Sequence, residues 1–353
     1  MKKVLKIILS LLLVLVLFVG GFVAYLSINE YYPKENEDIK IEGKGQKSLK
    51  VGDDISLLTF NVGYCSLDKD HDFFMDGGKT VNTESEQNIL ENLEGIKGII
   101  ARENPDVTFL QEVDKDSKRS YNVDQAEAFG DLFEDDCEAF ATNFLCDYIP
   151  YPMPTIGKVN GGILTLSKYN STSATRIPLA TSYKWPIRVC QLKRCLLVER
   201  IPIENSAKEL VLINLHLEAY ADEESKDVQT KVLANILKEE YKKGNYCIAG
   251  GDFNQSFENV DSDLYPVINT DYFEAELINS DYFGSDFSFV NDDSTPTSRL
   301  LNEPYDEQSE NTQYYVIDGF LVSSNIEVNS VKTLDEGFTY SDHNPVKMEV
   351  ILK

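Results

Sequence analysis

The chain contains the same order of elements twice: a strand, an amphipathic helix and a second strand. The first copy occupies residues 55–61, 84–102 and 106–113, and the second occupies residues 209–218, 223–243 and 246–254. In both helices apolar residues recur at three- and four-residue spacing, which gives each helix one apolar face. This repeated order predicts an α/β fold built around strand–helix–strand units.

Four further segments have the composition of strands: "GGILTLSKY", "RCLLVERIPI", "YVIDGFLVS" and "NPVKMEVILK". Because strands are many and helices few, we expect a sandwich of two mixed β-sheets with helices on the outside. Two long segments, 114–154 and 255–312, are polar and rich in aromatic residues. We expect them to form loops at one rim of the sandwich, where substrate selection usually resides.

Polar side chains stand at the ends or edges of these strands, where apolar side chains would pack better. They are Asn61, Glu112, His216, Asp252, Asn254, Asp318, Asp342 and His343. Each one alone is typical of a turn or of a half-buried strand position. Strand ends in an α/β sheet gather at one rim, so the set indicates a site there, and it includes two of the three histidines.

Seven short motifs, in order, resemble the endonuclease/exonuclease/phosphatase superfamily of metal-dependent phosphoesterases. They are "TFN" (59–61), "QEV" (111–113), "NGGILTLSKY" (160–169), "NLHLEA" (214–219), "GGDFN" (250–254), "IDGFLVS" (317–323) and "SDHNPV" (341–346). The resemblance implies a DNase I-like four-layer α/β/β/α sandwich. It also implies hydrolysis of a phosphodiester or phosphomonoester, by a nuclease, a phospholipid or sphingolipid phosphodiesterase, or a small-molecule phosphatase.

The resemblance assigns a divalent metal ion, Mg²⁺ or Mn²⁺, to Asn61, Glu112 and Asp342. Hard oxygen ligands of this kind suit Mg²⁺. Some family members carry an acidic residue two positions after the first of these residues. Here that position is Gly63, so we expect the metal site to have one ligand fewer.

The catalytic residues implied by the resemblance are His216, Asp252, Asn254, Asp318 and His343. His343 would contact the phosphoryl group as an imidazolium, and Asp318 would orient its ring and favour the charged form. Asp252 would orient or deprotonate the attacking water, and Asn254 would hold the phosphate. His216 matches the second histidine of the DNase I and sphingomyelinase branches, and it is a candidate acid for the leaving oxygen.

Three further residues are candidates for substrate binding. Asn160 opens the third motif, and Arg119 and Arg299 could clamp a phosphate because arginine binds such groups bidentately. Structural roles are the alternative for both arginines. We expect His71 to be a solvated loop residue and Trp185 to pack in the interior beside a proline turn.

The N-terminus differs in composition from the rest of the chain. We expect a basic cytoplasmic end (1–6), a transmembrane signal anchor (7–28), a polar stalk (29–53) and a catalytic domain (54–353). The run 7–28 carries no charge and is long enough to cross a bilayer. Lysines before it favour a cytoplasmic N-terminus, which puts the domain outside the cytoplasm at the cell membrane. A cleaved signal peptide is the alternative.

A net charge of −26 argues against a stable nucleic-acid complex held by basic patches. A bound cation can still supply positive charge locally to a phosphate ester. We expect a monomer whose partners are this substrate and the membrane. Disulfides are permitted outside the cytoplasm, and the pairs nearest in sequence are Cys137/Cys146 and Cys190/Cys195. A catalytically inactive binding module on the same fold is the competing hypothesis.

Overall fold

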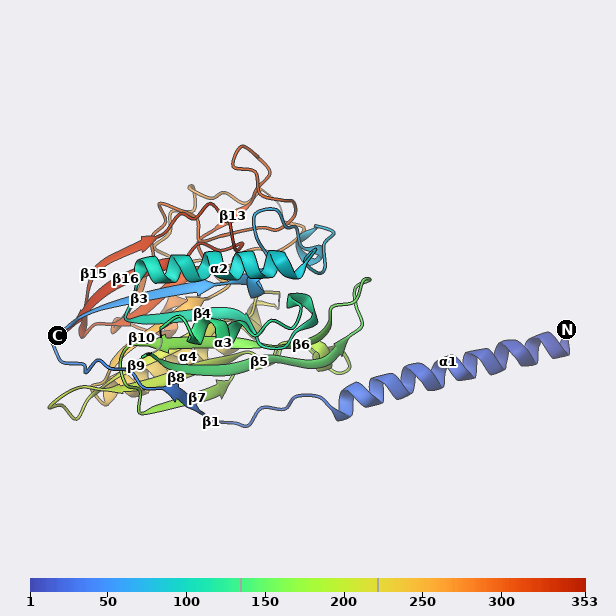
Figure 1. The fold of residues 1–353 in the computed structure, drawn as a ribbon, viewed down its shortest axis with the longest axis horizontal. Helices are drawn as coiled ribbons and strands as arrows, with labels where there is room; N and C mark the ends of the chain where they lie inside the picture. The colour runs from blue at the N-terminus through green and yellow to red at the C-terminus, as the bar shows by residue number, and fades with distance from the viewer. Residues whose placement is uncertain (134, 221, 269) are drawn as a thin grey trace.

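Two seven-stranded mixed sheets pack face to face in the computed structural model, which describes residues 1–353 except 134, 221 and 269 (Figure 1). The first sheet has the order β15 (Ile326–Thr333), β16 (Val346–Leu352), β3 (Asp54–Asn61), β4 (Val107–Asp114), β6 (Gly157–Ser167), β5 (Cys137–Ile149) and β2 (Ile41–Gly43). The second has the order β1 (Glu37–Ile39), β7 (Ser173–Pro178), β8 (Cys195–Pro202), β9 (Glu209–His216), β10 (Tyr246–Asp252), β14 (Asp318–Ser323) and β11 (Phe287–Val290). A two-stranded ladder joins β12 (Ser298–Arg299) to β13 (Tyr314–Tyr315).

Helices cover the outer faces of the sandwich, so the predicted four-layer arrangement is confirmed. Helix α2 (Glu86–Glu103) packs on the first sheet and α4 (Glu223–Lys242) on the second, each over its own apolar cluster. The Ser85 side chain accepts a hydrogen bond from the Asn88 backbone at the start of α2, and Asp222 caps α4 in the same way. A short helix, α3 (Gln125–Gly130), follows β4. A third cluster, built around Leu57, Phe109 and Phe320, fills the space between the sheets.

The pairing of the strands brings the predicted polar residues to one rim. Strands β3 and β4 are parallel, as are β9 and β10, which is the arrangement that each strand–helix–strand unit predicts. In the register of the second sheet, Asp252 lies directly opposite His216 on one side and Asp318 on the other. The register of β9, β10 and β14 therefore makes neighbours of three chemically active side chains from distant parts of the sequence.

Residues 29–53, expected to form a stalk, instead pack against the domain. Strand β1 pairs with β7 at the edge of the second sheet, and β2 pairs with β5 at the edge of the first. Farther along, Leu49 is fully buried between the sheets. Ile39 and Ile41 supply the apolar contacts that hold residues 29–53 on the domain, because they pack on the core between β5 and β8. The segment thus fixes the N-terminal helix to the domain.

One helix of the described part of the chain, α1 (Lys2–Ile28), is long and apolar enough to cross a membrane. Its most apolar 18-residue window is not buried in the protein, and Leu26 near its C-terminal end is the buried residue of the helix. It leaves the sandwich at the end where β3 and β4 finish, and the C-terminus lies at the opposite end (Figure 1). The segment 7–28 therefore forms a helix with the length and apolar composition that a membrane span needs.

Two expectations about single residues are wrong, and the two cysteines that approach each other are not neighbours in the sequence. Trp185 is 57% exposed, because it lies beside the end of α1, where its Nε1 donates to Ser27 Oγ at 3.0 Å. His71 is buried, because its loop folds over the Arg299 side chain, which donates to the His71 carbonyl. All six cysteines are free, and Cys146 lies 3.7 Å from Cys190 between their Sγ atoms.

Replacing Glu199 with glutamine should stabilise the protein at alkaline pH. Glu199 on β8 is buried with one oxygen unpaired, and burial raises the pKa of its carboxyl from 4.5 to about 7. The protonated form is therefore the stable one, and its contribution is lost as the pH rises from 4.5 through 7. At pH 8 we expect a gain of about 3 kcal/mol in the free energy of unfolding, falling to none below pH 4.5.

Thermal unfolding of the full chain in detergent at pH 5 and pH 8 measures the effect of this substitution. The exposed Glu204, changed to glutamine, serves as the control and should behave like the wild type at both pH values. Equal stability of the Glu199→Gln variant and the wild type at pH 8 would contradict the assignment.

Candidate active site

A cavity of about 770 Å³ opens at the rim where the strand ends meet. Six of the eight predicted metal and catalytic residues line it: Glu112, His216, Asp252, Asn254, Asp342 and His343. The other two, Asn61 and Asp318, stand directly behind this lining and bond to it. The structure thus brings together, at one place, side chains that come from six separate segments of the chain.

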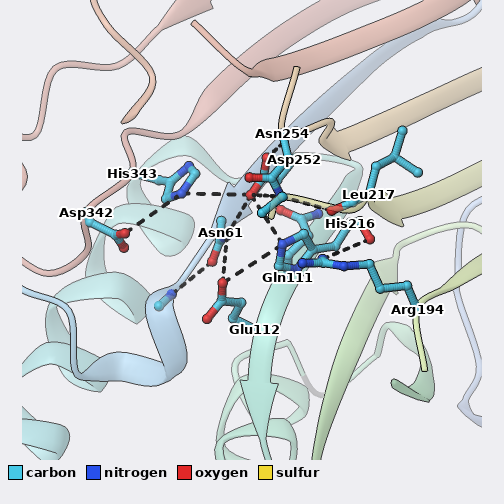
Figure 2. A network of polar contacts seen from close by, with 12 residues as sticks. Asn61, Gln111, Glu112, Arg194, His216, Leu217, Asp252, Asn254, Asp342 and His343 are labelled. Atoms are coloured by element: carbon cyan, nitrogen blue, oxygen red, sulfur yellow. Dashed lines mark hydrogen bonds and ion pairs between the residues drawn. The ribbon is translucent and has the colours of Figure 1, made fainter. Parts of the chain in front are cut away.

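Asp252 lies at the centre of the network (Figure 2). Its Oδ2 accepts from Asn61 Nδ2 at 3.0 Å, and it lies 3.5 Å from His216 Nε2 and 3.8 Å from His343 Nε2. Its Oδ1 accepts from the backbone nitrogen of Asn254 at 2.8 Å. Burial, reinforced by the neighbouring Asp318 carboxylate, raises the pKa of Asp252 to about 7. The carboxyl is therefore poised to exchange a proton near neutral pH.

His343 is held by Asp318 in an orientation that leaves its second nitrogen beside Ser298 and Asp252, which also line the cavity. Nδ1 lies 2.8 Å from Asp318 Oδ2, and Nε2 lies 3.3 Å from Ser298 Oγ. Burial by itself would lower the pKa of this imidazole, but the Asp318 and Asp342 carboxylates outweigh it and raise the pKa to about 10. His343 is therefore an imidazolium at neutral pH, with Nε2–H available for a phosphoryl oxygen.

Glu112 is turned into the cavity by an irregularity in β4. The pairing of β4 with β6 shifts register between Leu110 and Val113, and Glu112 has a φ of 56°. A non-glycine residue adopts this left-handed conformation only when its surroundings impose it, and such strain concentrates at functional sites. The Glu112 side chain is also the most exposed carboxylate of the network, at 25%. Asn61 Nδ2 donates to its Oε1 at 3.3 Å.

Asp342 lies on the other side of His343, with Oδ2 4.0 Å from His343 Nε2. Burial raises the pKa of Asp342 to about 6, opposed by His343 and assisted by Glu112. A Cβ atom added at Gly63, where φ is +49°, would lie 2.9 Å from Asp342 Oδ1. The Asp342 carboxylate thus takes the space that an acidic side chain at position 63 would need.

The residues present fit a divalent cation. Glu112, Asp342, Asp252 and Asp318 concentrate negative charge around one cavity, and buried carboxylates are stable when a cation or a hydrogen-bond donor compensates them. Asp318 Oδ1 is buried without a hydrogen-bond partner. The oxygen-rich donor set is the one that Mg²⁺ and Mn²⁺ prefer.

Ligand atoms of Asp252, Asp318 and His343 lie within 4.8 Å of one another, which is also a metal-like spacing. In that group, however, the His343–Asp318 pair is already joined by a hydrogen bond. An imidazolium carries no free lone pair for a metal. Glu112, Asn61 and Asp342 are therefore the better candidates, because their oxygens are not held by a cationic partner at bonding distance.

His216 differs from His343 in its electrostatic environment. It is buried, and burial, assisted by the nearby Arg194 and His343 cations, holds its pKa well below the usual range. Its Nδ1 has no hydrogen-bond partner among the described residues, and its Nε2 faces Asp252 and, at 4.0 Å, Glu112. The ring is therefore neutral at pH 7 and offers a hydrogen bond rather than a positive charge.

The three predicted substrate-binding residues lie in different environments. Asn160 does not line the cavity, and its backbone bonds Ser117 and Lys115. Arg299 borders the cavity but donates to four backbone carbonyls, those of Leu300, Glu303, Asp68 and His71. Arg119 also borders it, where it binds Asp114 through two nitrogens and stacks on Tyr64 at 3.8 Å. Both arginines thus support the cavity wall.

Changing Arg119 to leucine should destabilise the protein by about 3–5 kcal/mol, because it leaves the fully buried Asp114 carboxylate without its charge partner. Denaturant unfolding of the full chain in detergent measures this loss. Arg102→Leu is the matched control, since Arg102 is half exposed in its ion pair with Glu336 and should cost less than about 1 kcal/mol. A loss no larger than that of the control would contradict a structural role for Arg119.

Two sets of cavity residues were missed by sequence reasoning. Ser298 contacts His343 Nε2, and Tyr220 donates to Asp76 Oδ1 at 2.9 Å in the cavity wall. Burial raises the pKa of Asp76 to about 6. Nothing local in the sequence marks these residues, since Ser298 lies in a two-residue strand, Tyr220 in a loop and Asp76 in a short 3-10 helix.

The sandwich and its rim of carboxylates, amides and one imidazolium define a metal-dependent phosphoesterase of the DNase I-like class. The chain belongs to the Endonuclease/Exonuclease/phosphatase family, whose model matches residues 58–343. It is accordingly a hydrolase of phosphate ester bonds, in a family that depends on divalent metals. Comparison with curated proteins gives no significant match.

Solved structures with the same fold include three that cover most of this chain. An endonuclease/exonuclease/phosphatase from Beutenbergia cavernae has a TM-score of 0.58 at 17% identity, over 85% of this chain and 72% of that one. A Bacteroides vulgatus protein of the same description has a TM-score of 0.53 at 15% identity, over 85% of this chain and 100% of that one. The D. rerio TDP2, solved with a single-strand DNA product, has a TM-score of 0.50 at 14% identity, over 84% of this chain and 98% of that one. At these identities the likeness concerns the fold.

Proposed function

We infer that the protein is a membrane-anchored phosphoesterase that uses Mg²⁺ or Mn²⁺ and whose catalytic domain lies outside the cytoplasm. The observation that carries this proposal is that a buried imidazolium, His343, and a carboxylate without a cationic partner at bonding distance, Glu112, line one cavity. Glu112, Asn61 and Asp342 would hold the metal. When bound, the ion would neutralise charge on the phosphoryl oxygens and polarise the ester.

The protein's own residues supply the remaining chemistry. His343 donates Nε2–H to a phosphoryl oxygen and stabilises the negative charge that develops there, while Asp318 keeps the ring oriented. Asp252, whose pKa is about 7, accepts the proton of the attacking water. Asn254, with a φ of 50°, is fixed beside Asp252 to bind the phosphate. His216 directs a neutral N–H toward the leaving oxygen.

The N-terminal helix supports a single-pass membrane location. Three lysines, Lys2, Lys3 and Lys6, precede the uncharged run of the helix. Positive charges beside a membrane span stay on the cytoplasmic side. With one span, the domain that follows is then outside the cytoplasm. The first residue after the helix to be fixed in the domain is Glu30, which is buried and paired with Arg188 and Lys193.

Substrate class and turnover can be tested together. The full chain in detergent would be assayed with plasmid DNA, RNA, sphingomyelin, phosphatidylinositol phosphates and an aryl phosphodiester, each with Mg²⁺ and with EDTA. Metal-dependent turnover of at least one substrate is expected. An inactive binding module would instead be stabilised by a ligand, without turnover, equally in the wild type and in His343→Ala. That result would overturn the proposal.

A further inference from the structure

The wall of the active-site cavity includes the membrane helix itself. Phe22, Val23, Leu26 and Ser27 of α1 line the same cavity as Glu112 and His343. These four residues occupy the last two turns of the uncharged run, so they lie near its outer end. In a spanning helix that position corresponds to the head-group level of the outer leaflet. The catalytic cavity is therefore adjacent to the depth at which lipid phosphates lie.

The end of α1 is held firmly against the domain. Tyr25 OH donates to Asp147 Oδ2 at 2.9 Å, and the Phe22 ring meets the Tyr148 ring edge to face at 6.0 Å. Glu30 is buried between Arg188 at 3.1 Å and Lys193 at 3.0 Å. With the edge strands β1 and β2 following directly, no free stalk separates the helix from the domain. The rim that carries the active site therefore lies at the end of the sandwich from which α1 leaves (Figure 1).

Large apolar side chains are exposed around the mouth of the cavity. We call these residues the apolar rim: Met75, Tyr151, Met153, Trp185 and Ile187. Met75, Tyr151 and Ile187 line the cavity, while Met153 and Trp185, each within two residues along the chain of a lining residue, are 83% and 57% exposed. Exposed apolar clusters mark interaction surfaces, and tryptophan and tyrosine are enriched where proteins meet the membrane interface.

The interior of the cavity is apolar beyond the catalytic cluster. Leu67, Phe144, Ile149, Ile156, Leu192 and Leu301 belong to its lining. Two arginines that border it are paired with carboxylates, Arg119 with Asp114 and Arg194 with Glu218, while Arg299 donates to backbone carbonyls. A lipid can bury its apolar part against these walls, whereas a small soluble phosphate has no apolar part to bury.

We propose that the substrate is the phosphate ester of a bilayer lipid, which enters the cavity from the outer leaflet between α1 and the apolar rim. This inference rests on the proposed phosphoesterase function and specifies its substrate. The head-group phosphate lies at His343 and Glu112, and the glycerol or ceramide portion contacts the apolar walls. Hydrolysis adds water across the ester P–O bond and leaves a phosphorylated product and an alcohol.

The single tryptophan of the chain gives a direct test of membrane contact. The full chain would be placed in phosphatidylcholine nanodiscs with and without lipids that carry a shallow nitroxide quencher. Because Trp185 is part of the apolar rim, we expect the nitroxide lipid to quench its fluorescence at least twofold and aqueous iodide to quench it little. Strong iodide quenching without lipid quenching would overturn the proposal.

A substitution separates lipid docking from chemistry. Met153→Asp puts a charge on the rim outside the cavity, and Val51→Asp is the matched control at the opposite end of the domain, beside Leu352. The substrates are phosphatidylcholine, phosphatidylglycerol, phosphatidylinositol phosphate and sphingomyelin in nanodiscs, and a soluble aryl phosphodiester. We expect Met153→Asp to lower lipid turnover at least tenfold and leave aryl diester turnover within twofold, with Val51→Asp unchanged on both.

The outcomes are distinguishable. Wild-type turnover of the aryl diester without turnover of any lipid would overturn the lipid assignment but keep the phosphoesterase. Equal lipid turnover by Met153→Asp and the wild type would overturn entry over the apolar rim. No turnover of either kind of substrate by wild type would remove the proposed function on which the inference rests.

Discussion

Replacing His343 with alanine is expected to lower kcat by about 10³-fold or more, with a smaller change in KM. The imidazolium stabilises charge that develops in the transition state, and losing one such donor typically costs 10²–10³-fold, or up to about 10⁴-fold where proton transfer is also lost. Steady-state hydrolysis of an aryl phosphodiester by the full chain in detergent measures it. Circular dichroism and thermal unfolding establish that the variant is folded.

Asp318→Asn is the companion variant because it alters His343 without removing it. Asp318 raises the pKa of His343, so the loss of wild-type activity on the alkaline side should occur only as the pH rises toward about 10. Without that carboxylate, the alkaline limb of kcat/KM should move to lower pH. An unshifted limb would contradict the role of Asp318, and a His343→Ala variant within tenfold of the wild type would contradict that of His343.

Replacing Glu112 with glutamine is expected to weaken divalent metal binding by more than about 100-fold, since even residues behind metal ligands are worth 10–100-fold. Titration of Mn²⁺ into the full chain, followed by calorimetry or electron paramagnetic resonance, measures the affinity. Glu276→Gln is the control, because Glu276 is a partly exposed carboxylate paired with Lys226 away from the network. Unchanged Mn²⁺ affinity in Glu112→Gln would remove Glu112 from the metal site.

The stability of the metal-free Glu112→Gln variant provides a second check. The Glu112 carboxylate raises the pKa of Asp342, which means that the two repel each other. Removing that charge should leave the free energy of unfolding in EDTA unchanged or slightly higher. A large destabilisation would indicate that Glu112 supports the fold, so that any loss of metal binding could not be assigned to ligation.

The central elements could be predicted from the sequence because their signals are local. Strands β3 and β4 with helix α2, and strands β9 and β10 with helix α4, show apolar periodicity and clear end signals. Their parallel pairing follows from chain order, and it placed Asn61, Glu112, His216 and Asp252 at one rim. The family motifs then added Asp318 and His343 from the C-terminal strands.

The features that were missed depend on contacts between distant segments. Strands β1 and β2 are three residues each and polar, so nothing in their sequence distinguishes an edge strand from a stalk. The side chain of Trp185 bonds Ser27, which is 158 residues away on α1, so its surroundings are not visible in the local sequence. The close approach of Cys146 and Cys190 likewise joins segments 44 residues apart. The conformation of Glu112 arises from a register shift that no pattern reveals.

The most direct test of the phosphoesterase assignment is hydrolysis of an aryl phosphodiester by the full chain in detergent after treatment with EDTA. We predict negligible turnover in EDTA, recovery on addition of Mg²⁺ or Mn²⁺, and no recovery in the folded His343→Ala variant. Turnover that persists in EDTA, or that is the same in wild type and His343→Ala, would contradict a metal-dependent site built on Glu112 and His343.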